Sequence, residues 1–286
     1  MDSAEASASI SRRDFFAIAA AAGVVVYGSG RAIAAEDGPY GPFHMGIQSY
    51  SLRGYNTDEA LAKTVELGLS WWEAFPDHLP VTDDPAVIAG YKRKLADHRI
   101  RLASYGVVEF SNDEADARRK FEFARAMGLR TMSAHPQPDS FALLDKLVEE
   151  YRINLGIHNH GPGDELYARV DQVLAAIKGH SPRIGACDDT GHYLRSGEDP
   201  VKAARRFGPR LYGVHLKDVR IGPNGNREFT EIGKGLLDTV ALLRVLKNTN
   251  YERRGIISLE YEDHAEAPMP YIQECLAATR DAVKRM

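Results

Sequence analysis

The sequence contains few cysteines and no large excess of charge of either sign. Its 286 residues include only Cys187 and Cys275, which excludes a disulfide-stabilised scaffold and a cysteine-rich zinc site. Lys and Arg number 36, Asp and Glu number 40, and the net charge is -4. This balance lacks the basic surplus typical of nucleic-acid binding, so we expect no nucleic-acid partner. Hydrophobic residues make up 44% and charged residues 27%, which excludes a disordered or collagen-like chain.

The N-terminus carries the features of an export signal. Two arginines at 12–13 precede two phenylalanines, an uncharged stretch at 17–30 and the sequence Ala-Ile-Ala at 32–34. This pattern resembles a twin-arginine signal with a cleavage site. An uncleaved anchor is the alternative, but the apolar run is short of the roughly 20 residues that a span needs. We expect 1–34 to be a signal peptide and 35–286 to be a periplasmic or otherwise exported domain, with no membrane contact beyond export.

The rest of the chain alternates between short β-rich runs and longer amphipathic runs. We expect strands near 44–50, 69–75, 100–107, 129–134, 153–159, 183–189, 210–217 and 255–261, and helices near 57–67, 85–98, 112–127, 139–150, 168–178, 199–207, 237–249 and 270–283. Eight such units in about 250 residues predict an α/β fold, the TIM (β/α)8 barrel. The alternative is a doubly wound sheet, but no glycine-rich phosphate turn follows the first strand. Two long irregular segments, 76–84 and 218–236, follow strands and would lie at the carboxyl end of the barrel, where active sites form.

Imidazoles and carboxylates follow one another at the ends of the last four predicted strands. Side chains two apart share one face of a strand and adjacent side chains lie on opposite faces, so Asp189 and Asp188 point in opposite directions. A single histidine on a strand is more often a hydrogen-bonded core residue than a ligand. Four ionisable groups at matching depth would be costly to bury unpaired, and a divalent ion such as Mn²⁺, Zn²⁺, Co²⁺ or Mg²⁺ would offset that cost. The candidates are His158 or His160, Asp188 or Asp189, His215, and Glu260 or Glu262.

Two motifs give these positions a family likeness. Asp-Thr-Gly-His at 189–192 and His-Leu-Lys-Asp at 215–218 resemble the sugar phosphate isomerase/epimerase family, which belongs to the xylose isomerase-like TIM barrels. The resemblance covers essentially the whole mature chain. It implies one divalent metal ion, held by ligands at the ends of strands five to eight. At the matching positions stand His158, Asp189, His215 and Glu260.

The resemblance also implies roles for residues around the metal. Glu260 is the expected general base or acid, with His160 or His192 as the opposite partner in proton transfer. The residues expected to contact substrate are Glu73, His135, Lys217 and His192.

One position departs from the family pattern. Sugar epimerases of this superfamily commonly have a glutamate at the fifth-strand ligand position, where it exchanges a proton with the substrate opposite the eighth-strand glutamate. Here that position is His158, within His158-Asn159-His160. A neutral imidazole can bind metal, so we expect the ion to be retained and His160 or His158 to take the place of the missing base. The letters His-Asn-His also occur in a nuclease motif, but that motif needs a hairpin and a helix around it.

The leading functional hypothesis is metal-assisted proton abstraction next to the carbonyl of a small sugar-like substrate, through an enediolate. Reprotonation makes the protein an isomerase or epimerase. Loss of a β-oxygen group makes it a lyase or dehydratase of a keto-sugar or keto-glycoside, which is the runner-up. An exported, non-catalytic sugar- or metal-binding protein is a third hypothesis. A fourth is an apurinic-site endonuclease with several zinc ions, but the acidic net charge argues against it. The oligomeric state stays open.

Overall fold

The structure is a computed structural model that describes residues 38–286. By its internal contacts the chain divides into two units, Met1–Asp37 and Gly38–Met286. The segment predicted to be an export signal lies outside the described residues. Among the residues that are described, no helix combines the length and the apolar character that crossing a membrane requires.

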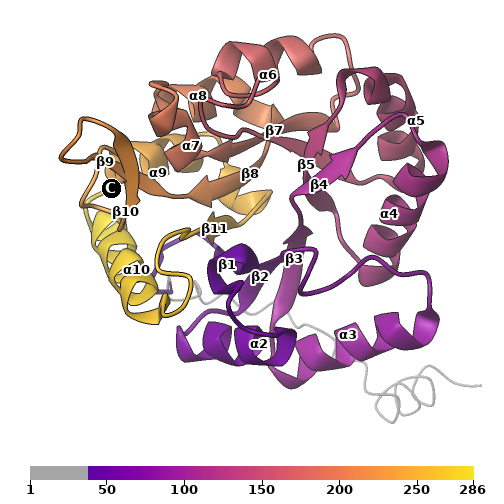
Figure 1. Ribbon diagram of the computed structural model, residues 1–286, viewed down its shortest axis with the longest axis horizontal. Helices are drawn as coiled ribbons and strands as arrows, with labels where there is room; N and C mark the ends of the chain where they lie inside the picture. The colour runs from indigo at the N-terminus through magenta and orange to yellow at the C-terminus, as the bar shows by residue number, and fades with distance from the viewer. Residues whose placement is uncertain (1–37) are drawn as a thin grey trace, which may run out of the picture. The chain divides into compact units, whose positions relative to one another are not determined.

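The centre of the described unit is a sheet of nine strands in which every neighbouring pair is parallel. Its order is β3-β2-β1-β11-β8-β7-β6-β5-β4, and helices surround it on the outside (Figure 1). The strands are β1 (Met45–Gln48), β2 (Trp71–Ala74), β3 (Arg101–Tyr105), β4 (Val108–Phe110), β5 (Thr131–Pro136), β6 (Asn154–His158), β7 (Ile184–Asp189), β8 (Leu211–Leu216) and β11 (Ile257–Leu259). This nearly closed parallel barrel confirms the predicted TIM-barrel fold.

The third strand was predicted as one continuous run over 100–107, and the structure differs from that prediction. It is divided, because β3 pairs with β2 whereas β4 pairs with β5. The chain bends at Gly106, where any side chain would overlap Ser133 of β5. Glycine therefore allows the chain to lie against β5, and the two halves of this strand form the two edges of the nearly closed barrel.

Helices follow the strands and cover the outside of the barrel. They are α2 (Thr57–Glu66), α3 (Pro85–Asp97), α4 (Glu114–Met127), α5 (Phe141–Tyr151), α6 (Val170–Ile177), α7 (Thr190–Arg195), α8 (Pro200–Phe207), α9 (Thr239–Asn248) and α10 (Met269–Lys284). Each predicted helix overlaps an observed one, and α7 is an additional short helix directly after β7. Several helices begin where a side-chain oxygen accepts a backbone N–H, as at Asn56, Asp84 and Asp113.

Strand alternation separates the core from the site. In β6, Leu155 and Ile157 are fully buried apolar residues, whereas His158 belongs to the alternate set. Apolar side chains on one face pack toward the helices, so the other face is free to carry polar groups inside the barrel. The fold thus directs chemistry-bearing side chains inward without removing apolar residues from the core.

The prediction of an irregular segment over 218–236 is wrong in part. Residues 218–221 and 227–230 form an antiparallel hairpin, β9 (Asp218–Ile221) and β10 (Arg227–Thr230). The Asp218 carboxylate holds the segment together by accepting backbone N–H groups from Val219, Gly233, Gly235 and Leu237 at 2.8–3.1 Å. The last residue of the His-Leu-Lys-Asp motif therefore has a structural task.

We predict that Asp218→Ala lowers the free energy of unfolding by about 2–4 kcal/mol, because several amides lose their acceptor at once. Chemical denaturation measures the change. The matched control is Asp238→Ala, which removes a single helix-capping contact to Ala241 and should cost about 1 kcal/mol. Equal losses for the two variants would contradict the organising role of Asp218.

Candidate active site at the carboxyl end of the barrel

The four predicted metal ligands converge in the structure. His158 ends β6, Asp189 ends β7, His215 lies near the end of β8 and Glu260 directly follows β11. One ligand atom from each lies within 4.8 Å of the others, and all four side chains are buried. Parallel pairing produces this convergence, because it aligns Asp189 with His215 on neighbouring strands. The cluster could hold a divalent cation.

The donor atoms of this cluster fit such an ion. Among the described residues, both buried ring nitrogens of His158 lack a hydrogen bond, and the nearest carboxylate oxygen to Nε2 is Asp189 Oδ2 at 3.4 Å. Burial lowers the pKa of His158, so its imidazole is neutral at pH 7 and has a lone pair to donate. Two imidazoles and two carboxylates are a donor set that suits Zn²⁺, Mn²⁺ or Co²⁺. Buried polar atoms without partners are otherwise rare and costly.

His215 is placed between carboxylates on both sides of its ring. Its Nε2 lies 3.1 Å from Glu73 Oε2, and its Nδ1 lies 3.1 Å from Glu260 Oε2 and 3.8 Å from Asp189 Oδ2. A neutral imidazole carries one N–H, so it can donate a hydrogen bond to a carboxylate on only one side of the ring. The other side requires a positive charge, which a second proton or a metal ion can supply.

Glu73 lies deeper in the barrel than the sequence indicated. Its two carboxylate oxygens accept the hydroxyl groups of Ser133 at 2.5 Å and Ser258 at 2.7 Å, and its side chain is almost fully buried. Burial alone would raise its pKa, but His215 lowers the pKa overall. The substrate contact that we expected of Glu73 stays a prediction. The carboxylate faces His215 from below.

Lys217 enters the same cluster. Its Nζ lies 2.9 Å from Asp189 Oδ2 and 2.9 Å from Glu260 Oε2, and it also contacts Glu262. Burial alone would lower the pKa of this ammonium, but Asp189, Glu260 and Glu262 raise it well above its usual range. A positive charge thus lies among the carboxylates, which shows that their field favours a cation.

A glycine makes room for that lysine. A Cβ at Gly191 would lie 2.6 Å from Cγ and 2.9 Å from Cβ of Lys217, distances that real Cβ contacts do not reach. Asp189 also begins α7 by accepting the backbone N–H of His192 at 2.7 Å. The 189–192 motif and the lysine of the 215–218 motif therefore fit together physically, a link that the sequence did not reveal.

His192 forms a pair with a residue missing from the predicted site. Its Nε2 lies 3.3 Å from Glu262 Oε1. Burial would raise the pKa of Glu262, but Lys217 and His192 lower it to about 2, so this carboxylate is ionised at neutral pH. The alternation Glu260-Tyr261-Glu262 made Glu262 a candidate, because residues two apart share a face of an extended chain, but the family resemblance selected Glu260.

His135 and His160 lie in a neighbouring cluster rather than in the four-residue group. His135 Nε2 lies 3.2 Å from Asp164 Oδ2, and His160 Nδ1 lies 3.7 Å from the same oxygen. The His160 ring centroid is 4.7 Å from that of His158, so the two clusters adjoin. Asp164 was not predicted; its position in the loop after β6 was the available signal.

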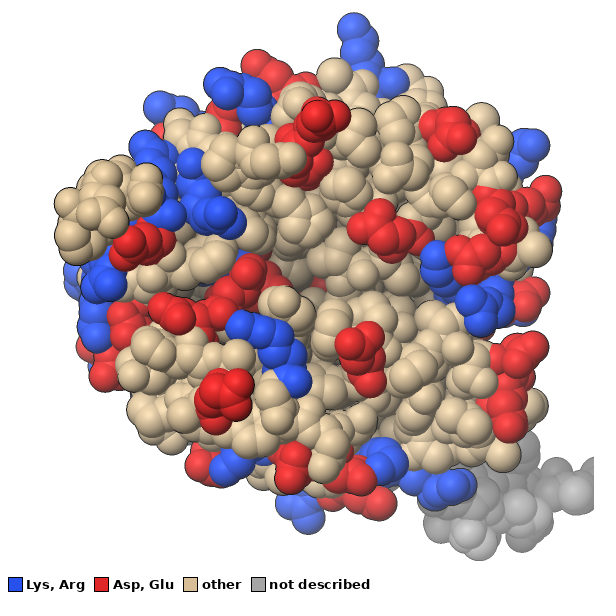
Figure 2. Space-filling view, viewed as in Figure 1, with Lys and Arg blue, Asp and Glu red and all other residues tan. Residues whose placement is uncertain are grey.

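The mouth of the barrel holds a cavity of about 330 Å³ that both clusters border. The face seen in Figure 2 is hollowed at its centre, and acidic side chains lie beside the hollow. Glu260, Glu262, His158, His160 and His192 line this cavity together with residues of the β1, β2 and β3 strand ends. Two of the metal donors, His158 and Glu260, therefore border the same cavity as the proton-carrying groups.

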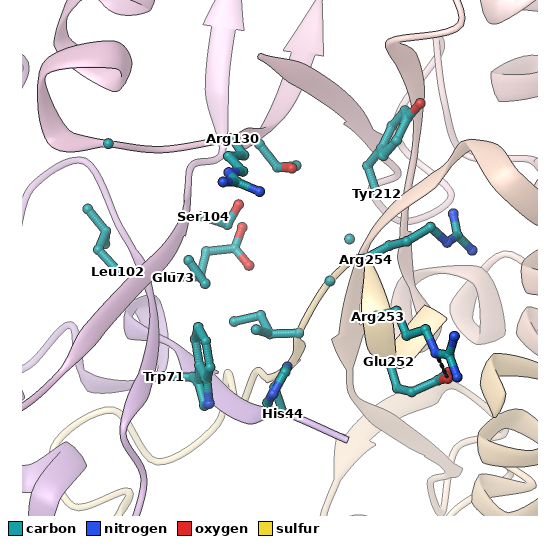
Figure 3. Close-up of a pocket in the computed structure, with 16 residues that line it drawn as sticks. His44, Trp71, Glu73, Leu102, Ser104, Arg130, Tyr212, Glu252, Arg253 and Arg254 are labelled. Carbon is teal, nitrogen blue, oxygen red and sulfur yellow. Dashed lines mark ion pairs between the residues drawn. The ribbon is translucent and has the colours of Figure 1, made fainter. Parts of the chain in front are cut away.

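A second cavity, of about 350 Å³, lies at the amino ends of the strands. Trp71, Arg130 and Arg254 border it, and Glu73 reaches it from inside the barrel (Figure 3). None of the four convergent donors lines it. Chemistry in TIM barrels takes place at the carboxyl end, so the mouth is the candidate active site.

Comparison with known proteins gives a consistent result. A model of the family described as xylose isomerase-like TIM barrel matches residues 61–282. An inosose dehydratase of Bacillus thuringiensis (strain Al Hakam) is 26% identical over 148 residues, which is 46% of this chain and 49% of that protein. An inosose dehydratase of Clostridium beijerinckii is similar to the same extent. The chain thus spans about half the length of these curated relatives in the match.

Solved structures resemble the chain over most of its length. A protein of Parabacteroides distasonis has a TM-score of 0.64 at 26% identity, covering 85% of this chain and 99% of that one. An L-ribulose 3-epimerase has a TM-score of 0.61 at 20% identity, covering 84% and 95%. An IolI protein with a bound zinc atom has a TM-score of 0.63 at 18% identity, covering 85% and 98%. The last two likenesses concern the fold alone.

We predict that Glu73→Gln weakens Mn²⁺ binding by about 10–100-fold, the usual cost of changing a group that orients a metal ligand. The amide removes the negative charge that faces His215 Nε2 but keeps the side-chain shape. Titration calorimetry measures the dissociation constant. Ser104→Ala, which alters the lining of the cavity at the amino ends of the strands, is the control. An unchanged Mn²⁺ affinity in Glu73→Gln would refute the orienting role.

Proposed function

The chain belongs to the xylose isomerase-like TIM barrel family, and from that premise we propose that it is a divalent-metal-dependent enzyme acting on a sugar or sugar-like ketone. Its reaction begins with removal of a proton from the carbon next to the carbonyl. The observation that carries this proposal is the convergence of His158, Asp189, His215 and Glu260. Two of them, His158 and Glu260, line the cavity that His192 and Glu262 also border.

A divalent ion held by those four residues supplies stabilisation of the negative charge that develops on the substrate oxygens. The chain's own residues carry the proton. Burial would raise the pKa of Glu260, but Lys217 and His215 lower it, so the carboxylate is ionised and able to accept a proton. We assign it the role of general base.

His192 is the better of the two predicted partners for returning the proton. Its backbone is fixed by Asp189, and its ring is oriented by Glu262 at 3.3 Å, the arrangement that a shuttling imidazole needs. His160 is more exposed and faces Asp164. Lys217, which contacts Glu260 and Glu262, holds both carboxylates in their ionised form.

Return of the proton to carbon gives isomerisation or epimerisation, which is the reaction we favour. Proton removal by one group and delivery by another is what inverts a carbon centre. Glu260 and the His192–Glu262 pair are two separate proton-carrying units on the cavity wall. The likeness in fold to an L-ribulose 3-epimerase is in keeping with this reaction.

Dehydration is the second candidate, and His158 is the observation that favours it. The chain has one carboxylate base where sugar epimerases of the superfamily commonly have two. Two curated relatives are named inosose dehydratase. In the dehydration reaction, Glu260 removes the proton next to the carbonyl and the β-carbon–oxygen bond breaks. His192 then protonates the departing hydroxyl to give water.

We predict that Glu260→Gln retains bound metal and loses at least about 100-fold in turnover, since an amide cannot accept the proton. Ketohexoses and inososes incubated in heavy water provide the assay, with mass spectrometry reporting deuterium at the carbon next to the carbonyl. In ordinary water, a new stereoisomer of unchanged mass identifies an isomerase or epimerase, and an unsaturated product lacking one water identifies a dehydratase.

The matched control is Glu66→Gln, an exposed glutamate of α2 that pairs with Lys63, and it should keep full activity. Full activity in Glu260→Gln would contradict the role of Glu260. Sugar binding without exchange in the unaltered protein would make it a non-catalytic binding protein.

Export remains a proposal supported by the sequence, through the arginines at 12–13. Replacing both by lysine keeps the positive charge and removes the twin-arginine pattern. We predict that the variant accumulates in the cytoplasm in uncleaved form, as fractionation and intact-mass measurement would show. Equal export of both forms would contradict a twin-arginine signal.

A further inference from the structure

Three groups that the proposed reaction does not use converge beside the four-ligand cluster. His135 lies in β5, His160 follows β6 by two residues, and Asp164 lies in the loop beyond. One atom from each of the three lies within 4.8 Å of the others. The group shares no residue with the first cluster, so its capacity to bind a ligand is independent of that site.

The surrounding structure holds Asp164 in position. Its Oδ1 accepts the backbone N–H of Leu166 at 2.9 Å. Its Oδ2 accepts the backbone N–H of His160 at 3.4 Å and faces the imidazoles of His135 and His160. The Asp164 side chain is only 7% exposed, and two imidazoles are its neighbours. Its orientation is therefore fixed by the loop before any ligand binds.

His135 is flanked by carboxylates at both nitrogens. Nδ1 lies 3.3 Å from Glu109 Oε2, and Nε2 lies 3.2 Å from Asp164 Oδ2. A neutral imidazole has one N–H for these two acceptors. A proton on Nδ1 toward the exposed Glu109 leaves the Nε2 lone pair facing Asp164, an arrangement that a cation between them would stabilise. The ring is kept in this position by Tyr167, whose ring packs edge-on at 5.0 Å.

We propose that His135, His160 and Asp164 form a second divalent-cation site at the mouth of the barrel. Two imidazole nitrogens and one carboxylate favour Zn²⁺ or Co²⁺ over Mg²⁺ or Ca²⁺. Three protein ligands leave at least one coordination position open, as in sites where a metal binds water or substrate. The ligand at that position is a water molecule or an oxygen of the substrate.

The cavity in front of the three groups is large enough to admit such a ligand. A cavity of about 530 Å³ opens there, lined by the three groups and by Glu109, His192 and Arg195. His192 and His160 line both this cavity and the central one. A cation at the second site therefore faces the same opening as the first and can bind a polar oxygen of a molecule whose reacting carbon lies at the four-ligand cluster.

The experiment counts Co²⁺ ions per folded chain. Protein stripped of metal is loaded with Co²⁺, free ion is removed, and bound cobalt is measured by elemental analysis. We expect two ions per chain for the unaltered protein, and one each for Asp164→Asn and His160→Gln. Asp189→Asn, which alters the first cluster alone, should also bind one. Failure of the first site and failure of the second are thus distinguished, and no activity measurement is needed.

His180→Gln is the matched control, because it removes another imidazole that contacts a carboxylate, Asp145, at 2.8 Å, with no second imidazole beside it. This variant should bind two ions. Circular dichroism confirms that each variant is folded, and His160→Gln, at a side chain that is 40% exposed, replaces Asp164→Asn if the latter is not. The proposal would be overturned, and the group would be a hydrogen-bonded trio, if the unaltered protein bound no ion or if folded His160→Gln bound as many ions as the unaltered protein.

Discussion

The need to neutralise buried carboxylates governs the structure of the barrel mouth. Asp189 and Glu260 are buried and face each other across His215 and Lys217. Charges at this depth are tolerated only where opposite charge and hydrogen bonds offset the loss of water. Lys217 offsets part of the negative charge, and the neutral imidazole of His158 offers one lone pair for a metal ion. The same electrostatic demand keeps Glu260 ionised, which is the state that a proton acceptor requires.

Local features of the chain allow these charged groups to pack together. Gly191 leaves space for Lys217, the bend at Gly106 brings the third strand against Ser133, and Ser133 in turn donates its hydroxyl to Glu73. Asp218 secures the hairpin that follows β8. Each feature lies within or next to a strand end, so the site depends on the closure of the barrel as much as on its own side chains.

Sequence reasoning predicted the barrel and the convergence of four groups because both follow from local periodicity. Residues two apart share a strand face, and parallel strands end at the same level, so each of the last four strands was expected to direct an imidazole or a carboxylate inward. The family resemblance then selected His158, Asp189, His215 and Glu260. The depth of Glu73 was not predictable in this way, because it depends on Ser133 and Ser258 on strands far away in the sequence. The position of Lys217 among the carboxylates likewise depends on contacts between motifs, and the loop position of Asp164 follows no period.

The most direct test of the central claim is anomalous diffraction from crystals of the protein loaded with Mn²⁺. The account predicts an anomalous peak enclosed by His158, Asp189, His215 and Glu260, with Lys217 turned from Asp189 toward Glu262. A map without a peak there, with the Lys217 ammonium still between Asp189 and Glu260, would contradict it. The cluster would then be a self-neutralised ion network, and the proposed metal-dependent reaction would lose its basis.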